Sequence, residues 1–172
     1  MARSKHTEIR FEEAIEQELL ASGGFIKGDP KTYDLEKALF PEIVVSFLQK
    51  SQPKKWEALK QILGDKTSET LLHDLTKELT AKGSLHVLRH GFKCFGKSFR
   101  LAFFTPNSGM NEEAWRDYKS NVLTITRQVH FSTRNSNLSL DVVLALNGLP
   151  VVTLELKNPL TNQTIEHAIH QY

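Results

Sequence analysis

The sequence has one cysteine, Cys94, in 172 residues, which excludes an internal disulfide framework and a zinc site built from four cysteines. Long apolar runs are also missing. The opening residues, MARSKHTEIRFEE, hold no signal-peptide core, and no later segment reaches the roughly 18 apolar residues that span a bilayer. A reducing, cytoplasmic setting without membrane contact is expected.

An excess of charge of one sign is missing too. The formal net charge is +2, with 24% charged and 40% hydrophobic residues. These are ordinary globular values, which permit contact with nucleic acid without arguing for it. The length suits one domain covering residues 1–172.

Apolar periodicity predicts helices in the first half of the chain and again at its end. The expected helices are residues 7–21, 34–49 with a possible break at Pro41, 53–63, 68–81 and 164–172. After Gly83, the β-branched and aromatic segments LHVLRHGF, SFRLAFF and NVLTITRQVHFS predict strands. The pattern indicates an α/β fold, and the helix-like end suggests a fragment boundary.

The most informative segment, LDVVLALNGLPVVTLELK, holds two apolar runs on either side of Asn147-Gly148, a strong hairpin signal. The loop length decides whether Asp141 lies on the same face of the hairpin as Glu155. A two-residue loop would pair position 141 with 154 and separate Asp141 from Glu155, whereas a three-residue loop would pair 141 with 155. We predict the three-residue loop Asn147 to Leu149, or another loop of odd length.

Carboxylates at the ends of two apolar strands need a partner. Asp141 and Glu155 suit a Mg²⁺ site, to which Leu156 offers only its backbone carbonyl. Lys157 lies two residues after Glu155, on the same strand face, and suits a role toward an attacking water. The same residues also suit a turn aspartate and a solvated ion pair, and the spacing alone does not choose.

The segment GFKCFGKS, residues 91–98, satisfies the phosphate-loop pattern G-x-x-x-x-G-K-[ST]. A nucleotide-binding loop of this kind opens a helix, but FRLAFF and Pro106 follow here. We therefore expect a strand-turn-strand with Lys93 and Lys97 on the surface. The nearby phenylalanines are expected in the core: Phe92, Phe95, Phe99, Phe103 and Phe104. His167 and His170 lack a third zinc ligand nearby and are expected to face solvent or DNA.

The hairpin NLSLDVVLALNGLPVVTLELKN resembles the nuclease hairpin of the restriction subunits of type I restriction-modification enzymes, in the PD-(D/E)xK superfamily. The resemblance extends to TEIRFEEAIEQELLASGGF and NEEAWRDYKSNVLTITRQVHFS. It implies that Asp141 and Glu155 bind the metal and that Lys157 is the catalytic lysine. The proline of the superfamily motif is replaced by Leu140, a lenient position.

The resemblance also implies supporting residues. The glutamine of the family's Q-x-x-x-Y element falls on Gln171, and its tyrosine would lie beyond Tyr172. A glutamate of the first helix often joins such a site, with Glu8 and Glu12 as candidates that also suit plain solvated charges. Arg127 and Gln128 either touch DNA or brace the sheet, and bracing is expected.

The resemblance implies a restriction-endonuclease-like mixed β-sheet flanked by the first and last helices, with residues 34–81 as a helical segment at one end. It implies a Mg²⁺-dependent endonuclease domain that cuts double-stranded DNA after ATP-driven translocation by a helicase-like motor outside this chain. Modification (methyltransferase) and specificity subunits are the implied partners, and the fragment alone is expected to be nearly inactive. The alternative is a non-catalytic module with a nuclease-like fold that docks DNA or a subunit.

Overall fold

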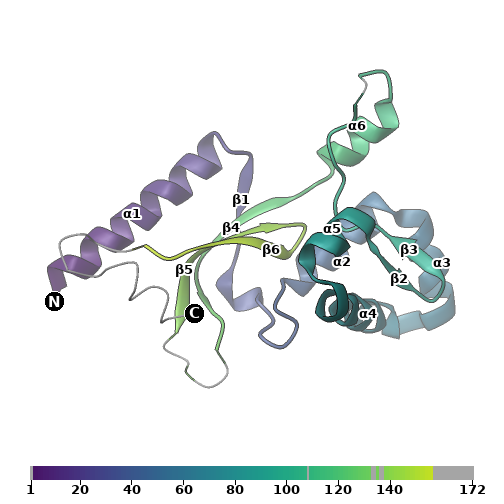
Figure 1. The fold of residues 1–172 in the computed structure, drawn as a ribbon, viewed down its shortest axis with the longest axis horizontal. Helices are drawn as coiled ribbons and strands as arrows, with labels where there is room; N and C mark the ends of the chain where they lie inside the picture. The colour runs from purple at the N-terminus through teal and green to yellow at the C-terminus, as the bar shows by residue number, and fades with distance from the viewer. Residues whose placement is uncertain (1, 108, 133–134, 136–137, 157–172) are drawn as a thin grey trace.

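The computed structural model describes residues 2–107, 109–132, 135 and 138–156, with side chains of the first helix from residue 9 onward. Its centre is a four-stranded sheet in the order β1-β4-β5-β6. The strands are β1 (Phe25–Lys27), β4 (Leu123–His130), β5 (Ser139–Leu146) and β6 (Leu149–Leu154). β1 is parallel to β4, and β4, β5 and β6 are antiparallel neighbours (Figure 1). The expected α/β fold with a mixed sheet is confirmed.

Helix α1 (Ala2–Ala21) contacts β1 and β4 and lies along one side of the sheet (Figure 1). It forms where the periodicity predicts it, but its most buried residues are acidic. Glu12 and Glu16 are 2% and 6% exposed, whereas Phe11 is 57% exposed. Two glutamates spaced by four residues lie on one helical face, and burying them requires cationic or amide partners. α1 therefore presents carboxylates to the sheet.

Residues 41–99 form a second body beside the sheet, named here the helical unit (Figure 1). It comprises α2 (Pro41–Ser51), α3 (Pro53–Leu63), η2 (Gly64–Lys66), α4 (Thr67–Lys82), α5 (Ser84–His90), β2 (Phe92–Cys94) and β3 (Lys97–Phe99). A proline begins α2 and α3, because the first helical turn leaves backbone N–H groups unpaired and proline has none. The expected helical segment at one end of the sheet is confirmed.

One expected helix is shorter than predicted. The segment 34–49 becomes helical only at Pro41. Before it, the Asp34 carboxylate holds a turn by accepting the backbone N–H of Lys37 at 2.9 Å. The short helix η1 (Pro30–Thr32) precedes this turn. A local side-chain hydrogen bond thus competes successfully with helix formation.

The prediction of a strand over LHVLRHGF is wrong, since most of this segment belongs to helix α5. The helix lies between two glycines with positive φ, Gly83 at 82° and Gly91 at 74°. Val87 is fully buried in the core of the helical unit. A short apolar run fits a buried strand and a buried helix equally well, so tertiary packing decides its conformation.

The segment GFKCFGKS forms the antiparallel pair β2–β3, as expected, with Cys94 paired to Lys97. Its turn consists of Phe95 and Gly96, with φ values of 46° and 72°. The strand expected over SFRLAFF ends at Phe99, and no helix begins before α6 (Glu112–Lys119) in the described part of this segment. The structure therefore lacks the helix that a phosphate loop requires.

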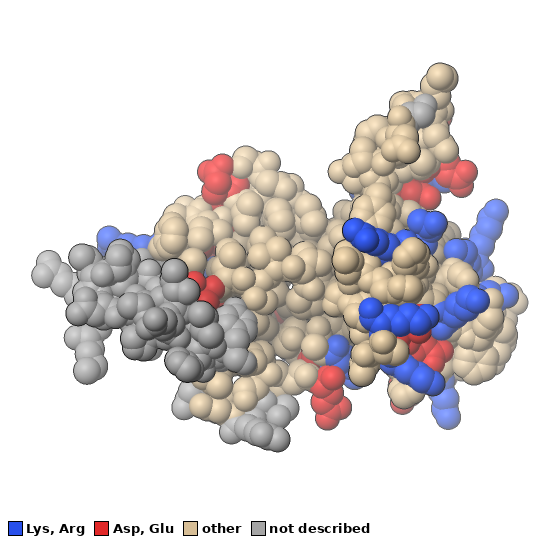
Figure 2. Space-filling model, in the orientation of Figure 1, with Lys and Arg blue, Asp and Glu red and all other residues tan. Residues whose placement is uncertain are grey.

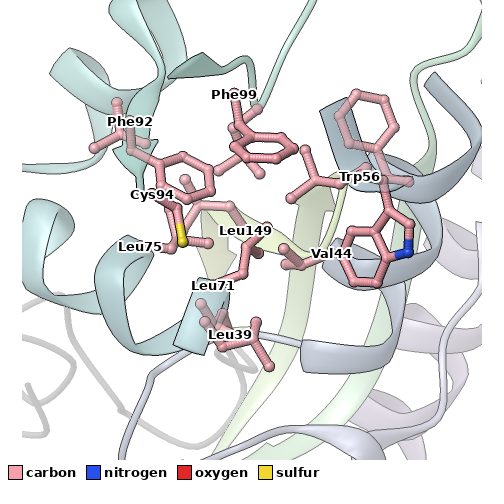
Figure 3. Close-up of a cluster of buried hydrophobic side chains, with 14 of the residues drawn as sticks. Leu39, Val44, Trp56, Leu71, Leu75, Phe92, Cys94, Phe99 and Leu149 are labelled. Atoms are coloured by element: carbon pink, nitrogen blue, oxygen red, sulfur yellow. The ribbon is translucent and has the colours of Figure 1, made fainter. Parts of the chain in front are cut away.

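The largest hydrophobic cluster belongs to the helical unit and includes Leu149 of the hairpin (Figure 3). Phe92 and Phe99 stack within it at a ring-centroid distance of 5.8 Å. Phe95 and Phe104, also expected in the core, are more than half exposed. Burial raises the pKa of the Cys94 thiol to about 12, which keeps this group protonated. Of the described helices, none is long and apolar enough to cross a membrane.

Asn147, in the turn between β5 and β6, joins the sheet to the rest of the chain. It is fully buried, with φ 52°. Its Oδ1 accepts the backbone N–H of Val122 at 2.6 Å, and its Nδ2 donates to the carbonyl of Leu101 at 2.9 Å. Beside it, a Cβ on Gly148 would lie 2.7 Å from the carbonyl oxygen of Phe40. The turn therefore needs asparagine and glycine for contacts as well as for conformation.

Candidate functional site

The register of the β5–β6 hairpin decides whether Asp141 meets Glu155. Leu146 pairs with Leu149, so the turn has two residues and the expected three-residue loop is wrong. Asparagine followed by glycine suits the two-residue turn with positive φ at both positions, which matches the twist of the strands. With a regular ladder, this loop would put the two carboxylates on opposite faces.

A bulge in β6 restores the register. Ala145 pairs with Pro150, whereas Leu144 pairs with Val152, so one residue of β6 has no partner. Proline cannot donate a hydrogen bond to the ladder, and bulges are among the few sheet positions that accept it. Beyond the bulge the register equals that of a three-residue loop, and Asp141 meets the segment that follows β6.

Asp141 contacts that segment directly. Its Oδ2 accepts a hydrogen bond from the backbone N–H of Leu156 at 2.6 Å. Its Oδ1 lies 3.4 Å from Nε2 of Gln128, which donates to it. The structure therefore brings Asp141 beside the backbone of Glu155–Leu156, the three positions predicted for the metal.

Gln128 lies opposite Asp141 at an irregular point of β4. The β4–β5 ladder skips this position, and the residue has φ 52°, which is uncommon outside glycine. Its Nε2 donates to Glu12 Oε1 at 2.9 Å as well as to Asp141, and its Oε1 accepts from Ser139 Oγ at 3.0 Å. One amide thus connects the carboxylate of α1 to that of β5.

Arg127, the residue before Gln128, binds an acidic cluster on α1 that consists of Glu12, Glu13 and Glu16. Its guanidinium lies 3.2 Å from Glu12, 3.5 Å from Glu16 and 3.8 Å from Glu13, and Lys27 lies 3.0 Å from Glu16. Glu16 Oε1 is buried without a hydrogen-bond partner among the described residues. Three glutamates share two cations, so the cluster keeps an excess of negative charge. These contacts show Arg127 and Gln128 bracing α1 against the sheet.

Several predicted site residues lie outside the described part of the chain. Lys157 and Gln171 are among them, as is the expected terminal helix over 164–172 with its two histidines. Glu8 belongs to α1, but its side chain is not described. Of the two glutamate candidates from the first helix, Glu12 is therefore the one whose contacts are known.

The donor chemistry of the site fits Mg²⁺, which prefers oxygen ligands and commonly takes one or two carboxylates together with water. Asp141, Glu155 and the carbonyl of Leu156 supply such oxygens. The side-chain amide of Gln128 links Asp141 to Glu12. Within the described residues, no three His, Cys, Asp or Glu side chains converge as a metal cage.

Sequence reasoning missed Glu16, and it named Gln128 as a bracing residue without predicting its contacts with Glu12 and Asp141. Glu16 follows Glu12 by four residues, so it lies on the same helical face, and this spacing was the signal that could have found it. The role of Gln128 had no comparable signal, because its contact with Glu12 joins residues separated by 116 positions. The bulge in β6 had only the proline at position 150 as a sign.

A comparison with known protein families assigns the chain to one of them. Residues 9–172 match the family described as Type I restriction enzyme R protein N terminus. Comparison with curated proteins and with solved structures gave no match. The family match covers the described sheet, the helical unit and the hairpin with Asp141. The chain therefore belongs to the family formed by the amino-terminal regions of type I restriction enzyme R proteins.

Proposed function

We propose that this chain is the Mg²⁺-dependent endonuclease domain of its restriction enzyme and that it hydrolyses phosphodiester bonds of double-stranded DNA. The contact between Asp141 and the backbone of Leu156 carries the proposal, because it joins the two strand ends that hold the predicted metal-binding carboxylates. The family supports a role in restriction, and the acidic cluster on the sheet supports a cation-dependent reaction.

Asp141, Glu155 and the Leu156 carbonyl would hold the ion. When bound, Mg²⁺ polarises the scissile phosphate and lowers the pKa of a coordinated water. Gln128 and Arg127 are positioning residues: the amide of Gln128 holds Glu12 and Asp141 together, and Arg127 fixes α1 against β4. Fixed carboxylates reduce the reorganisation needed as charge develops during the reaction.

Lys157 is proposed to orient the water or to accept its proton, and Gln171 would support the site from the segment that follows. In the reaction, a water oxygen bonds to phosphorus, the bond from phosphorus to one sugar oxygen breaks, and that leaving oxygen takes up a proton. General acid–base help of this kind typically contributes about 10²- to 10⁴-fold to the rate.

The domain is proposed to act within a larger assembly. A specificity subunit would read the DNA sequence and a modification subunit would methylate it. The motor region of the R protein would consume ATP to translocate DNA. This chain would then cut without sequence preference of its own, and it would have little activity alone.

The test is Asp141→Asn in the assembled restriction enzyme, with plasmid cleavage and ATP hydrolysis measured together. Cleavage is expected to fall by roughly a thousandfold, as for loss of a group that stabilises transition-state charge, while ATP hydrolysis persists. Asp65→Asn, the same substitution on the exposed surface of the helical unit, is the control and should leave both activities unchanged. Retained cleavage in Asp141→Asn would show a docking module instead.

A further inference from the structure

Residues 79–111 contain no aspartate or glutamate, although they hold five basic side chains and two histidines. These are Lys82, Arg89, Lys93, Lys97, Arg100, His86 and His90. The fold places them at the end of α4, on α5 and around the β2–β3 hairpin. Figure 2 shows Lys and Arg side chains gathered over the helical unit.

A groove of about 320 Å³ runs between these elements and is lined by Lys82, His86, His90 and Lys93. Its one acidic lining residue, Glu78, is already paired with Lys82 at 2.7 Å. The hydrogen bond from Lys82 and the nearby positive charges of His86 and Lys93 hold the pKa of Glu78 below its usual value. The groove therefore offers positive charge to an external anion.

The two lysines of the hairpin, Lys93 and Lys97, make no salt bridge with any described residue. Lys27 and Arg127 on the sheet side differ from them, since both are bound to buried glutamates. A lysine that forms no salt bridge with the described part of the chain is available to a phosphate.

Phe95, at the tip of the hairpin between these lysines, is in an unfavourable conformation. It is 56% exposed and has φ 46°, at a two-residue turn position that favours asparagine, aspartate or glycine. Because its side chain is exposed, Phe95 contributes little hydrophobic stabilisation to the fold. Strained residues of this kind often occur at binding sites, where the side chain has a use outside the fold.

We propose that the β2–β3 hairpin and the adjoining groove hold the backbone of double-stranded DNA, with Lys93 and Lys97 on phosphates and Phe95 inserted as an apolar contact in the minor groove. This rests on the proposed function, in which duplex DNA is the substrate. The acidic cluster on the sheet repels phosphates, so the domain needs a separate positive surface to hold its substrate. The phosphate-loop pattern of GFKCFGKS thereby acquires a different use.

The experiment measures binding of a labelled random-sequence duplex to the chain by fluorescence anisotropy in EDTA, across a range of salt. Lys93→Gln/Lys97→Gln should bind about tenfold more weakly, and its salt slope should fall by about 1.8, the value for two lost phosphate contacts. Phe95→Asn should bind roughly fivefold more weakly with an unchanged salt slope, because no charge is removed.

The matched control, Lys54→Gln/Lys60→Gln, removes the same charge from exposed positions on α3 and should change the affinity less than twofold. Equal weakening in both double variants would mean that net charge alone matters and would overturn the proposal. So would a wild-type chain that does not bind duplex at low salt, and the basic face would then suit an acidic protein partner.

The outcome is separable from that of the proposed function. Binding in EDTA does not require cleavage, so Asp141→Asn should keep or raise the affinity because it removes one negative charge. If that variant still cut DNA, the assignment of the acidic site would fail, but the ratio between the two lysine double variants would still decide the role of the hairpin.

Discussion

The sheet and the helical unit handle charge in opposite ways. On the sheet side, Glu12 and Glu16 are buried and share Arg127 and Lys27. On the helical unit, the lysines of the β2–β3 hairpin make no salt bridge with a described residue. Buried charges need fixed partners because they have lost their hydration, whereas water stabilises exposed charges without a partner in the protein.

In the proposed function, this difference would separate two requirements of a DNA-cutting domain. Catalysis needs carboxylates held at fixed positions, and the fold achieves this at a cost in desolvation. Holding a polyanion needs cations that are accessible and adjustable, and the surface of the helical unit provides them cheaply. A large stability loss is therefore expected when a charge on the sheet is removed, and a small one when a charge on the helical unit is removed.

The largest effect is expected for Arg127→Ala. It leaves Glu12 and Glu16 buried without their guanidinium, and breaking a buried pair in this way costs about 4 kcal/mol. Urea unfolding followed by circular dichroism measures it. Adding Glu12→Gln to the variant should restore part of the stability, because Glu12 loses its cation whereas Glu16 keeps Lys27.

The control for this prediction is Arg116→Ala on α6. Arg116 pairs with Glu113 at 3.7 Å, with both side chains at least 74% exposed. An exposed pair of this kind is worth about 0–1 kcal/mol, so the unfolding curve should barely move. Similar losses in the two arginine variants would remove the distinction between buried and solvated charge.

Asn147→Ala tests the joint between the two regions and should cost about 3 kcal/mol. It leaves the backbone N–H of Val122 and the carbonyl of Leu101 without this partner, and it puts alanine at positive φ. Asn147→Gly loses the same hydrogen bonds but tolerates the conformation, so it should be the more stable variant by about 1 kcal/mol. Equal stability of the two variants would contradict a conformational contribution.

The hairpin shows how far sequence reasoning reaches. Strand alternation and Asn147-Gly148 located both strands and the turn, since these signals are local. The loop length was wrong, because the residue that corrects the register lies within β6 beside Pro150 and not in the turn. A bulge depends on packing along the whole strand, which local signals do not report. The neighbour of Asp141 was therefore predicted correctly, but from an incorrect loop length.

The acidic cluster shows a different limit. Glu12 was named as a candidate by resemblance, and the structure gives it two partners from β4. Periodicity gave α1 an apolar face, yet Phe11 is exposed and Glu16 is buried. Helix spacing predicts which residues share a face, but which face turns inward depends on distant groups such as Arg127, more than a hundred residues away.

Metal binding should stabilise the chain through the carboxylates on the sheet side. If Mn²⁺ or Mg²⁺ binds the site, a concentration a hundredfold above the dissociation constant should stabilise the chain by about 2.7 kcal/mol. The melting temperature should rise, and EDTA should reverse the rise. Asp141→Asn should abolish most of the shift, whereas Asp65→Asn should keep it. An equal shift in the Asp141 variant would place the ion elsewhere.

The smallest effect is expected at the tip of the basic hairpin, and it has the opposite sign. Asn147-Gly148 and Phe95-Gly96 are both two-residue turns with positive φ, but only the first has the favoured residue. Phe95→Asn should therefore stabilise the chain by about 1 kcal/mol, raising the melting temperature by a few degrees. Scanning calorimetry measures the shift.

Phe95→Asn joins this gain in stability to a loss of DNA affinity in the same variant. Such a pairing separates the two possible roles of the phenylalanine, since a side chain that packs against its own fold would lose stability when replaced. A lower melting temperature in Phe95→Asn would mean that Phe95 serves the helical unit. A higher one, with weaker binding, would mean that the strain is retained for contact with DNA.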